Sequence, residues 1–382
     1  MSNDKTDASA LPAEQRGGWM SFVKSIASFS GDLSKMTAPS FILSPVSLTE
    51  YPSYWGEHPE MFDAIAQAKT PEERMVAVLK WFISTLKGQY TARNTSMGSE
   101  KKPLNPILGE QFLGKWPASG EQGETTLISE QVSHHPPITA YELQNKAAGV
   151  TVEGHSGQKT SFNGRSIVVH QVGHAMLRLD LGNGNKEEYL ITLPTLSIDG
   201  LWFGSPYIEL TDTSYIHSST GLLATINYSG KGYFSGKAHT YNATVVPDKT
   251  PSNLILEASG DWSGVSHVKK SSLLPAQSVF WDADKSPRKE VVVAQIQEQG
   301  PQESRKVWKT VADGIRSGNY DLASKDKSRI ENEQRKLRKE HEEKGTKHQL
   351  KYFKHITSDS TYASLVGPCK GLPATQESYI RS

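Results

Sequence analysis

Two adjacent histidines followed by two prolines are the residues of this chain best suited to chemistry. They close the segment 130–137, which has the sequence EQVSHHPP. Imidazoles can bind metals, transfer protons or donate hydrogen bonds to a phosphate. The prolines fix φ, remove two backbone donors and push His135 into extended geometry. Because this composition is unusual for a core strand or an ordinary turn, we expect the segment to hold both imidazoles in place.

Two enzymatic uses of these residues fit the sequence poorly. A metal site at Glu130, His134 and His135 lacks an HExxH motif and cysteine pairs, and neighbouring side chains on a strand point to opposite faces. A serine hydrolase at Ser133 lacks a GxSxG elbow. We therefore expect a protein that is not an enzyme and that holds no metal or other cofactor.

A late charged segment, 321–344, is expected to be helical. Within it Lys327, Glu331 and Arg335 recur at i, i+4 and i+8, so they share one side of the helix. Such a ladder usually means only a solvated surface, with about 0.2–0.5 kcal/mol of stabilisation per pair. From the residues alone, that interpretation stays open.

An amphipathic helix is expected near the N-terminus. Its polar face carries serines and a single lysine, Lys24, which favours apolar insertion into a bilayer over charge-driven binding. A helix packed permanently on the core fits the same periodicity equally well. The apolar stripe comprises Trp19, Phe22, Val23, Ile26, Phe29, Leu33 and Met36.

A second helix is expected from residue 71 to residue 88. Thr70 and Glu73 have the spacing of a capping box, and Gly88 should end the helix. Gln89 and Tyr90 follow, either in a surface loop or with their polar tips against an apolar wall.

Residues from about 125 to 263 have the pattern of β-strands joined by short turns. Residues 177–181 alternate apolar and polar, 182–185 form a Gly-Asn-Gly-Asn turn, and 189–193 return, which predicts a hairpin. No helix-length crossover separates the strands, so the sheet should be antiparallel. Many strands with short turns predict a sandwich or a barrel, and a wide barrel encloses a lumen. After Pro301 the pattern becomes helical again.

Composition limits the possible partners. The chain has 42 Lys and Arg against 41 Asp and Glu, so its net charge of +1 recruits neither nucleic acid nor an anionic membrane. Cys369 is the only cysteine, which indicates a reducing compartment. No run of about 18 apolar residues or secretory signal is present. We expect a cytoplasmic monomer whose membrane contacts are peripheral and reversible.

The histidine segment is similar to the fingerprint of the oxysterol-binding-protein family, which are cytosolic lipid carriers, and all eight residues match. Residues 102–106, KPLNP, followed by 108–110, LGE, resemble a second segment of that family. Lys327, Glu331 and Arg335 resemble the charged positions of its late helix. The resemblance covers roughly residues 17–350 and is nearest to the short, single-domain yeast members.

The resemblance implies an α+β fold dominated by a large antiparallel β-barrel around a lipid tunnel, with an N-terminal helical lid and flanking helices. It implies a disordered tail at 1–16, a lipid-binding domain at 17–355 and an unassigned tail at 356–382. Within the domain we expect the lid at 17–45, a helical segment at 46–90, the barrel at about 91–265 and C-terminal helices at about 300–355.

The resemblance also implies two ends of one binding site. A phosphorylated inositol headgroup would bind at the mouth, because burying a phosphate requires charge-assisted hydrogen bonds. A sterol would place its hydroxyl at the tunnel base, under the lid. The expected headgroup residues are Lys102, Asn105, His134, His135, Lys327, Glu331 and Arg335. The expected sterol and lid residues are Trp19, Phe22, Leu33, Met36, Ile42, Gln89 and Tyr90.

The function implied is mutually exclusive binding of a sterol, ergosterol or cholesterol, and phosphatidylinositol 4-phosphate, with exchange between membranes. Such a protein would work in the cytoplasm, on the surfaces of the Golgi and the endoplasmic reticulum. Two alternatives stay open. The protein could be a phosphoinositide sensor or scaffold that transfers nothing, or it could carry phosphatidylserine in place of sterol, because phosphatidylserine carriers of the family share the histidine box.

Overall fold

The computed structural model describes residues 13–29, 33, 36, 38–91, 101–119, 123–230 and 237–382. Residues 1–12 of the expected N-terminal tail, part of the expected lid and residues 92–100 of the expected barrel lie outside the described residues. Residues 13–16, which we expected in the tail, belong instead to the first helix, α1 (Ala13–Ser28).

The N-terminal region is mainly helical, and it buries Trp19, Val23 and Ile26 of the predicted apolar stripe while Phe29 stays exposed. After α1 come η2 (Ser40–Ile42), the short strand β1 (Leu43–Ser47), η3 (Leu48–Gly56), α2 (Pro59–Gln67) and α3 (Pro71–Tyr90). The predicted capping box is confirmed, since the Thr70 side chain accepts from the Glu73 amide and the Glu73 carboxylate accepts from the Thr70 amide. The apolar face of α3 is buried throughout.

Gly88 does not end α3 as predicted, because the helix continues through Gln89 and Tyr90. A Cβ added at Gly88 would lie 1.7 Å from the Glu57 carboxylate. The glycine therefore permits a close approach of η3 rather than a helix end. Gln89 and Tyr90 are both buried in the last turn of α3, so the surface-loop alternative is wrong.

Fifteen of the described strands, β3 to β17, build one large antiparallel sheet. The expected hairpin at 177–193 is confirmed by the pairing of β8 with β9. The strands are β3 (Gln111–Trp116), β4 (Thr125–His134), β5 (Pro137–Asn145), β6 (Val150–Phe162), β7 (Ile167–Val172), β8 (Ala175–Asp180), β9 (Lys186–Ile191), β10 (Thr195–Asp199), β11 (Tyr207–Thr211), β12 (Thr213–Ser218), β13 (Leu222–Ser229), β14 (Thr240–Pro247), β15 (Leu256–Asp261), β16 (Val265–Ser271) and β17 (Val279–Asp282).

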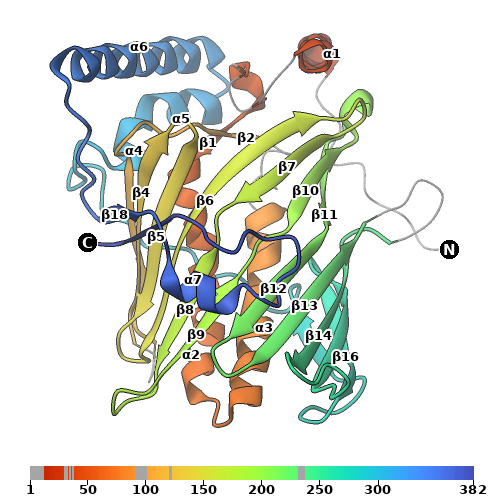
Figure 1. Ribbon diagram of the computed structural model, residues 1–382. Coiled ribbons are helices and arrows are strands. Elements are labelled where there is room, and N and C mark those ends of the chain that lie inside the picture. The colour runs from red at the N-terminus through yellow and green to blue at the C-terminus, as the bar shows by residue number, and fades with distance from the viewer. Residues whose placement is uncertain are drawn as a thin grey trace.

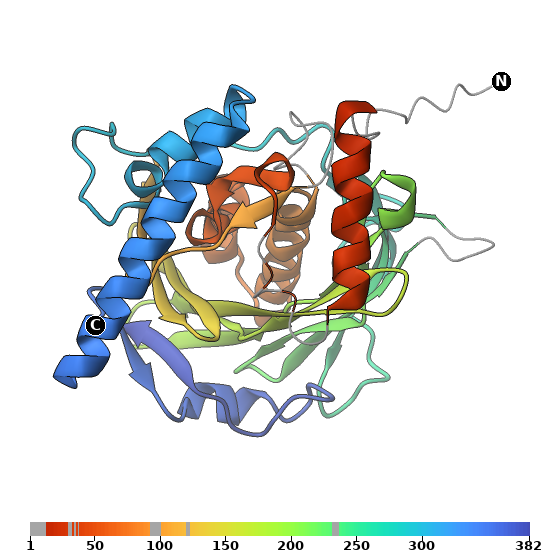
Figure 2. The same ribbon diagram turned by 90° about the horizontal axis from the view of Figure 1, so that it is seen from above.

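The long strand β6 is the branch point of the sheet. Its first half pairs with β8 and its second half with β7, while β5 pairs with residues 150–157. One branch runs through β7, β10 and β11, and the other through β8, β9 and β12 to β17. The sheet curls around α3, as Figure 1 shows from the side and Figure 2 from above.

Hydrogen bonds between the described strands do not close this sheet into a barrel. Instead, the edge strand β3 is covered by the segment that follows β17. Lys115 and Val292 exchange two backbone hydrogen bonds of 2.9 and 2.8 Å, and the Trp116 indole donates to the Lys289 carbonyl at 2.8 Å. The predicted α+β fold with a large antiparallel sheet is therefore confirmed, whereas closure of that sheet into a barrel by strand pairing is not observed among the described strands.

The C-terminal region supplies helices at one end of the sheet and a cover on its outside. The elements are α4 (Ser304–Val307), α5 (Lys309–Arg316), α6 (Tyr320–Lys344), β18 (Phe353–Ile356), α7 (Ser360–Leu365) and β19 (Ser378–Arg381). Tyr362 and Cys369 are buried against Met176 and Leu190 of the sheet, so the tail that the sequence left unassigned is packed on β8 and β9 (Figure 1). Among the described helices, none is long and apolar enough to cross a membrane.

A short parallel pair completes the end of the molecule that carries α6. The strand β2 (Lys102–Leu104) pairs with β1. In the view of Figure 2, α1 and α6 lie on opposite sides of this end, with the helices around β1 and α3 between them. The sheet, α1 and the charged helix α6 therefore lie around the same end of the molecule (Figure 2).

Candidate functional site

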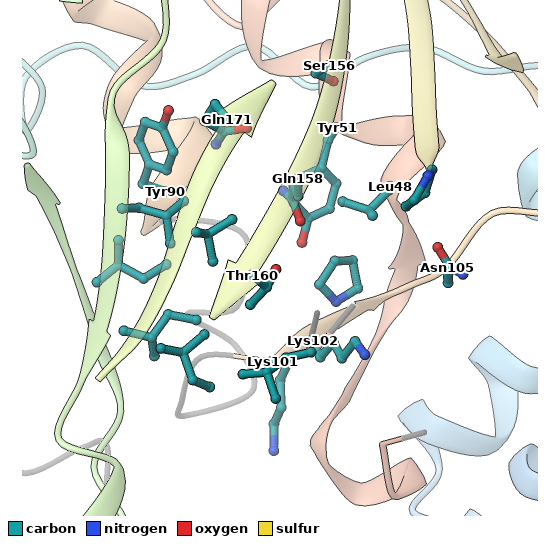
Figure 3. Close-up of a pocket in the computed structure, with 18 of the residues that line it drawn as sticks. Leu48, Tyr51, Tyr90, Lys101, Lys102, Asn105, Ser156, Gln158, Thr160 and Gln171 are labelled. Atoms are coloured by element: carbon teal, nitrogen blue, oxygen red, sulfur yellow. The ribbon is translucent and has the colours of Figure 1, made fainter. Parts of the chain in front are cut away.

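A cavity lies between the inner face of the sheet, the end of α3 and the N-terminal region. Its walls are mainly apolar and aromatic, and several of its polar groups come from β2, β6 and β7 (Figure 3). All seven residues expected at the sterol and lid positions line it. These are Trp19, Phe22, Leu33, Met36, Ile42, Gln89 and Tyr90. Lys102 and Asn105 of the expected headgroup set line it as well.

The deep end of the cavity presents two buried polar groups that lack partners. The Tyr90 hydroxyl and the Gln89 Oε1 atom form no hydrogen bond within the part of the chain that the structure describes. Burial raises the pKa of Tyr90 well above its ordinary value, so the phenol stays protonated and can donate. Gln171 of β7 lies beside Tyr90 and interacts with it, although the geometry is not that of a hydrogen bond (Figure 3).

Two lysines of the β2 region hold the N-terminal segment at the mouth. Lys101 Nζ donates to the Phe41 carbonyl at 3.0 Å, and Lys102 Nζ donates to the Met36 carbonyl at 3.1 Å. Burial lowers the pKa of Lys101. Both cations therefore lie beside the cavity while they contact the backbone of residues 36–41.

The two histidines lie at the tip of the β4–β5 hairpin, on the rim rather than in the cavity. His134 pairs with Pro137 across a two-residue turn, and the His135–Pro136 peptide bond is cis. His134 Nδ1 donates to the Pro106 carbonyl at 3.1 Å, which fixes this ring against the segment that carries Asn105. The ring centroids of His134 and His135 are 4.7 Å apart.

The charge state of His134 follows from these surroundings. Burial lowers its pKa, and the neighbouring His135 and Arg338 charges act in the same direction. The Pro106 carbonyl and Glu331 act in the opposite direction. His134 is therefore mainly neutral at neutral pH, and a nearby anion would favour its protonation.

The charged helix α6 faces the histidines. Ala323 and Ile330 bury its inner side against Trp308 and Ile315 of the neighbouring helices. Lys327 and Glu331 form an ion pair, and Arg335 Nη2 lies 3.9 Å from the Glu331 carboxylate, so the predicted ladder shares one face.

Sequence reasoning missed Arg338. Its guanidinium donates to His135 Nε2 at 3.1 Å, the direct contact between α6 and the histidine hairpin. Arg338 lies three residues beyond Arg335, so the same helical periodicity, continued by one step, could have identified it. Lys101 was recognisable only as a neighbour of Lys102, and nothing in the strand pattern marked Gln171.

Five of the expected headgroup residues do not line the cavity itself. These are His134, His135, Lys327, Glu331 and Arg335. They form a separate rim with Arg338, linked to the cavity through the Pro106 contact and the segment that carries Lys102 and Asn105. Among the described residues, no group of three or more His, Cys, Asp or Glu side chains could hold a metal ion. The arrangement can bind an elongated apolar molecule with a polar group at either end.

The chain belongs to the oxysterol-binding protein family, whose family model matches residues 19–314 and 311–368. Protein KES1 of Mycosarcoma maydis is 60% identical over 372 residues, which cover 97% of this chain and 96% of that protein. Protein kes1 of Schizosaccharomyces pombe is 50% identical over 364 residues, covering 94% and 92%.

Two solved structures have the same fold. The Osh1 ORD domain in complex with cholesterol superposes with a TM-score of 0.73 at 20% identity, covering 97% of this chain and 95% of that one. The Osh3 ORD of Saccharomyces cerevisiae in complex with PI(4)P gives a TM-score of 0.68 at 22% identity, covering 88% and 87%. At these identities the likeness establishes the α+β architecture only.

Proposed function

We propose that this protein transfers lipids, binding a sterol or phosphatidylinositol 4-phosphate in the one cavity and exchanging them between membranes. The observation that carries the proposal is the polarity of the site. Its walls are apolar, its deep end has a buried amide and phenol, and its mouth has lysines, histidines and an arginine. The complexes of Osh1 with cholesterol and of Osh3 with PI(4)P support both ligand classes.

The sterol, ergosterol or cholesterol, would enter with its hydroxyl towards Gln89 and Tyr90. A sterol of about two dozen carbons needs apolar cover worth on the order of 15–20 kcal/mol to leave a bilayer, at about 0.8 kcal/mol per methylene. The lid residues Trp19 and Phe22, with the wall residues of β7 and β10, would supply that cover. The hydroxyl would also satisfy polar atoms whose unmet hydrogen bonds cost about 1–3 kcal/mol each.

The phosphoinositide would leave its headgroup at the rim. A phosphate there could accept from the Lys102 ammonium, from His134 and His135 and from Arg338, and such charge-assisted hydrogen bonds are the strong ones. Lys327 and Arg335 would add positive charge and Asn105 an amide donor. Glu331 would orient Lys327 and Arg335.

Exclusive binding follows from the lid contact as well as from the shared lumen. In the structure Lys102 donates to the carbonyl of Met36, a residue of the proposed lid. If the Lys102 ammonium reorients towards a bound phosphate, its hydrogen bond to Met36 weakens. Headgroup binding should therefore loosen the lid that a buried sterol requires.

In this proposal the curled sheet, with the segment that covers β3, acts as a closed barrel around the lipid. The protein is a monomer without catalytic activity. It works in the cytoplasm and docks reversibly on the membranes of the Golgi and the endoplasmic reticulum.

The experiment is lipid extraction from liposomes by the double variant His134→Ala, His135→Ala, with His170→Ala as control, an exposed histidine of β7 outside the cavity and the rim. Phosphoinositide extraction should be abolished in the double variant, while sterol extraction should persist. Equal loss of both lipids would contradict the headgroup site. If the wild type extracts neither sterol nor phosphoinositide, a sensor or scaffold that transfers nothing is favoured. If it extracts phosphatidylserine in place of sterol, the protein is a phosphatidylserine carrier.

A further inference from the structure

The turn that joins β10 to β11 carries the most exposed large apolar side chain of the described residues. Phe203 is 90% exposed, and Trp202 and Tyr207 beside it are 39% and 37% exposed. Residues 200–207 have the sequence GLWFGSPY and include no charged residue. Clustered exposed aromatic side chains commonly mark an interaction surface.

This loop, which contains the short helix η5 (Leu201–Phe203), pairs three of its backbone amides internally. The Phe203 and Ser205 amides donate to the Gly200 carbonyl at 3.1 and 3.3 Å, and the Gly204 amide donates to Leu201 at 3.3 Å. Gly200 has a φ of 73°, and a Cβ there would lie 2.1 Å from the Ser205 carbonyl. Because these three amides are already paired, they add little to the desolvation cost when the tip of the loop enters an apolar medium.

Neighbouring elements hold the loop at the mouth of the cavity. The Trp202 indole donates to the Gly164 carbonyl at 3.2 Å, and the Trp19 indole of α1 donates to the Leu201 carbonyl at 2.8 Å. Leu201 is buried and lines the cavity, whereas Phe203 is not part of the lining. Figure 2 shows this turn, in green, beside α1.

We infer that Phe203, flanked by Trp202 and Tyr207, inserts into the headgroup–acyl boundary of a lipid bilayer when the cavity mouth docks on a membrane. The inference rests on the proposed function, since a protein that exchanges lipids must bring this mouth to a bilayer. Trp and Tyr are enriched at the membrane interface, and a Phe ring without a polar group can insert more deeply. A tip of three side chains is too small for a stable protein interface, which needs about 1,200 Å² or more.

The first test is cosedimentation with vesicles of phosphatidylcholine alone, which contain neither sterol nor phosphoinositide. Phe203→Ser should bind these vesicles at least about tenfold more weakly than the wild type, because the loss of one buried aromatic side chain changes a partition constant by roughly that factor or more. The control is Val279→Ser, which removes an apolar side chain that is 53% exposed at the start of β17 and does not line the cavity. It should bind like the wild type.

The second test places a fluorophore at the tip. The sole native cysteine, Cys369, is buried and burial raises its pKa to about 12, so Phe203→Cys can be labelled selectively with an environment-sensitive dye. Its emission should shift to the blue when the vesicles are added, and the same dye on Val279→Cys should not respond. Equal vesicle binding by the two serine variants, or an unchanged spectrum at position 203, would refute the insertion. A concentration-dependent dimer lost in Phe203→Ser would identify a second copy as the occupant and refute it too.

A third measurement separates this inference from the proposed function. Sterol delivered on cyclodextrin, without membranes, should bind Phe203→Ser as it binds the wild type. A wild type that binds neither sterol nor phosphoinositide would overturn the proposed function, whereas the vesicle experiments would still decide whether the loop inserts.

Discussion

Removing one oxygen atom at the deep end of the cavity should weaken sterol binding without weakening the fold. Tyr90 is 5% exposed, and its hydroxyl has no hydrogen-bond partner among the described residues. In the free protein that unmet group costs about 1–3 kcal/mol, so Tyr90→Phe should leave the Tm unchanged or raise it. A bound sterol hydroxyl would supply the missing partner. One neutral hydrogen bond contributes about 0.5–1.5 kcal/mol net, so Kd should rise about 2- to 12-fold.

The assay is titration with a fluorescent sterol, read by energy transfer from the protein's tryptophans. Tyr241→Phe is the matched control, because Tyr241 is also buried, its hydroxyl lacks a hydrogen bond in the described structure, and it does not line the cavity. The control should bind sterol like the wild type, and phosphoinositide binding should be unchanged in both variants. An equal loss of sterol affinity in the two variants, or none in Tyr90→Phe, would refute the placement of the sterol hydroxyl.

Three further predictions concern the charged groups. Arg338→Ala should weaken phosphoinositide binding about tenfold or more, because it removes a charge-assisted contact. The control is Arg329→Ala, since Arg329 of α6 has the same 54% side-chain exposure but pairs with Asp326 and Glu333, and this variant should bind like the wild type. Equal effects of the two variants in a binding titration would contradict the headgroup site. Since burial lowers the pKa of His134 and a phosphate would raise it, phosphoinositide affinity should increase from about pH 8 to about pH 6 while sterol affinity stays flat, and parallel pH profiles for both lipids would count against this histidine. Burial lowers the pKa of His155 to about 3, so as the pH drops the unfolded chain takes up this proton before the folded protein does, and the free energy of unfolding should fall by up to about 1.4 kcal/mol per pH unit between about pH 6.5 and pH 3. Denaturant titrations at several pH values should show that the free energy of unfolding of His155→Phe depends less steeply on pH, and an unchanged pH dependence would contradict this role of His155.

Local patterns predicted the elements that local physics specifies. The start of α3 is set by the capping box at Thr70, and the hairpin of β8 and β9 is set by alternation and by the turn at 182–185. The end of α3 could not be predicted in the same way. Gly88 has the residue type of a helix terminator, but the reason for glycine there is the Glu57 carboxylate, which comes close only in the folded chain.

The features that the sequence did not predict depend on contacts between residues far apart in the chain. Strands that look alike in sequence gave no sign that β6 would pair with both β7 and β8, or that the segment after β17 would cover β3. The residues of the cavity were recognised from their likeness to a family, since periodicity left Gln89 and Tyr90 undecided. Arg338 was missed because the charged ladder was followed only as far as Arg335, and its contact with His135 is visible only in the folded chain.

The central claim is that one cavity holds either lipid and never both, and native mass spectrometry tests it most directly. The protein would be incubated with sterol and phosphatidylinositol 4-phosphate together, at concentrations that saturate each lipid alone. The account predicts two populations, one carrying a single sterol and one a single phosphoinositide, whose proportions follow the lipid ratio. A species with both lipids bound to one chain would contradict it.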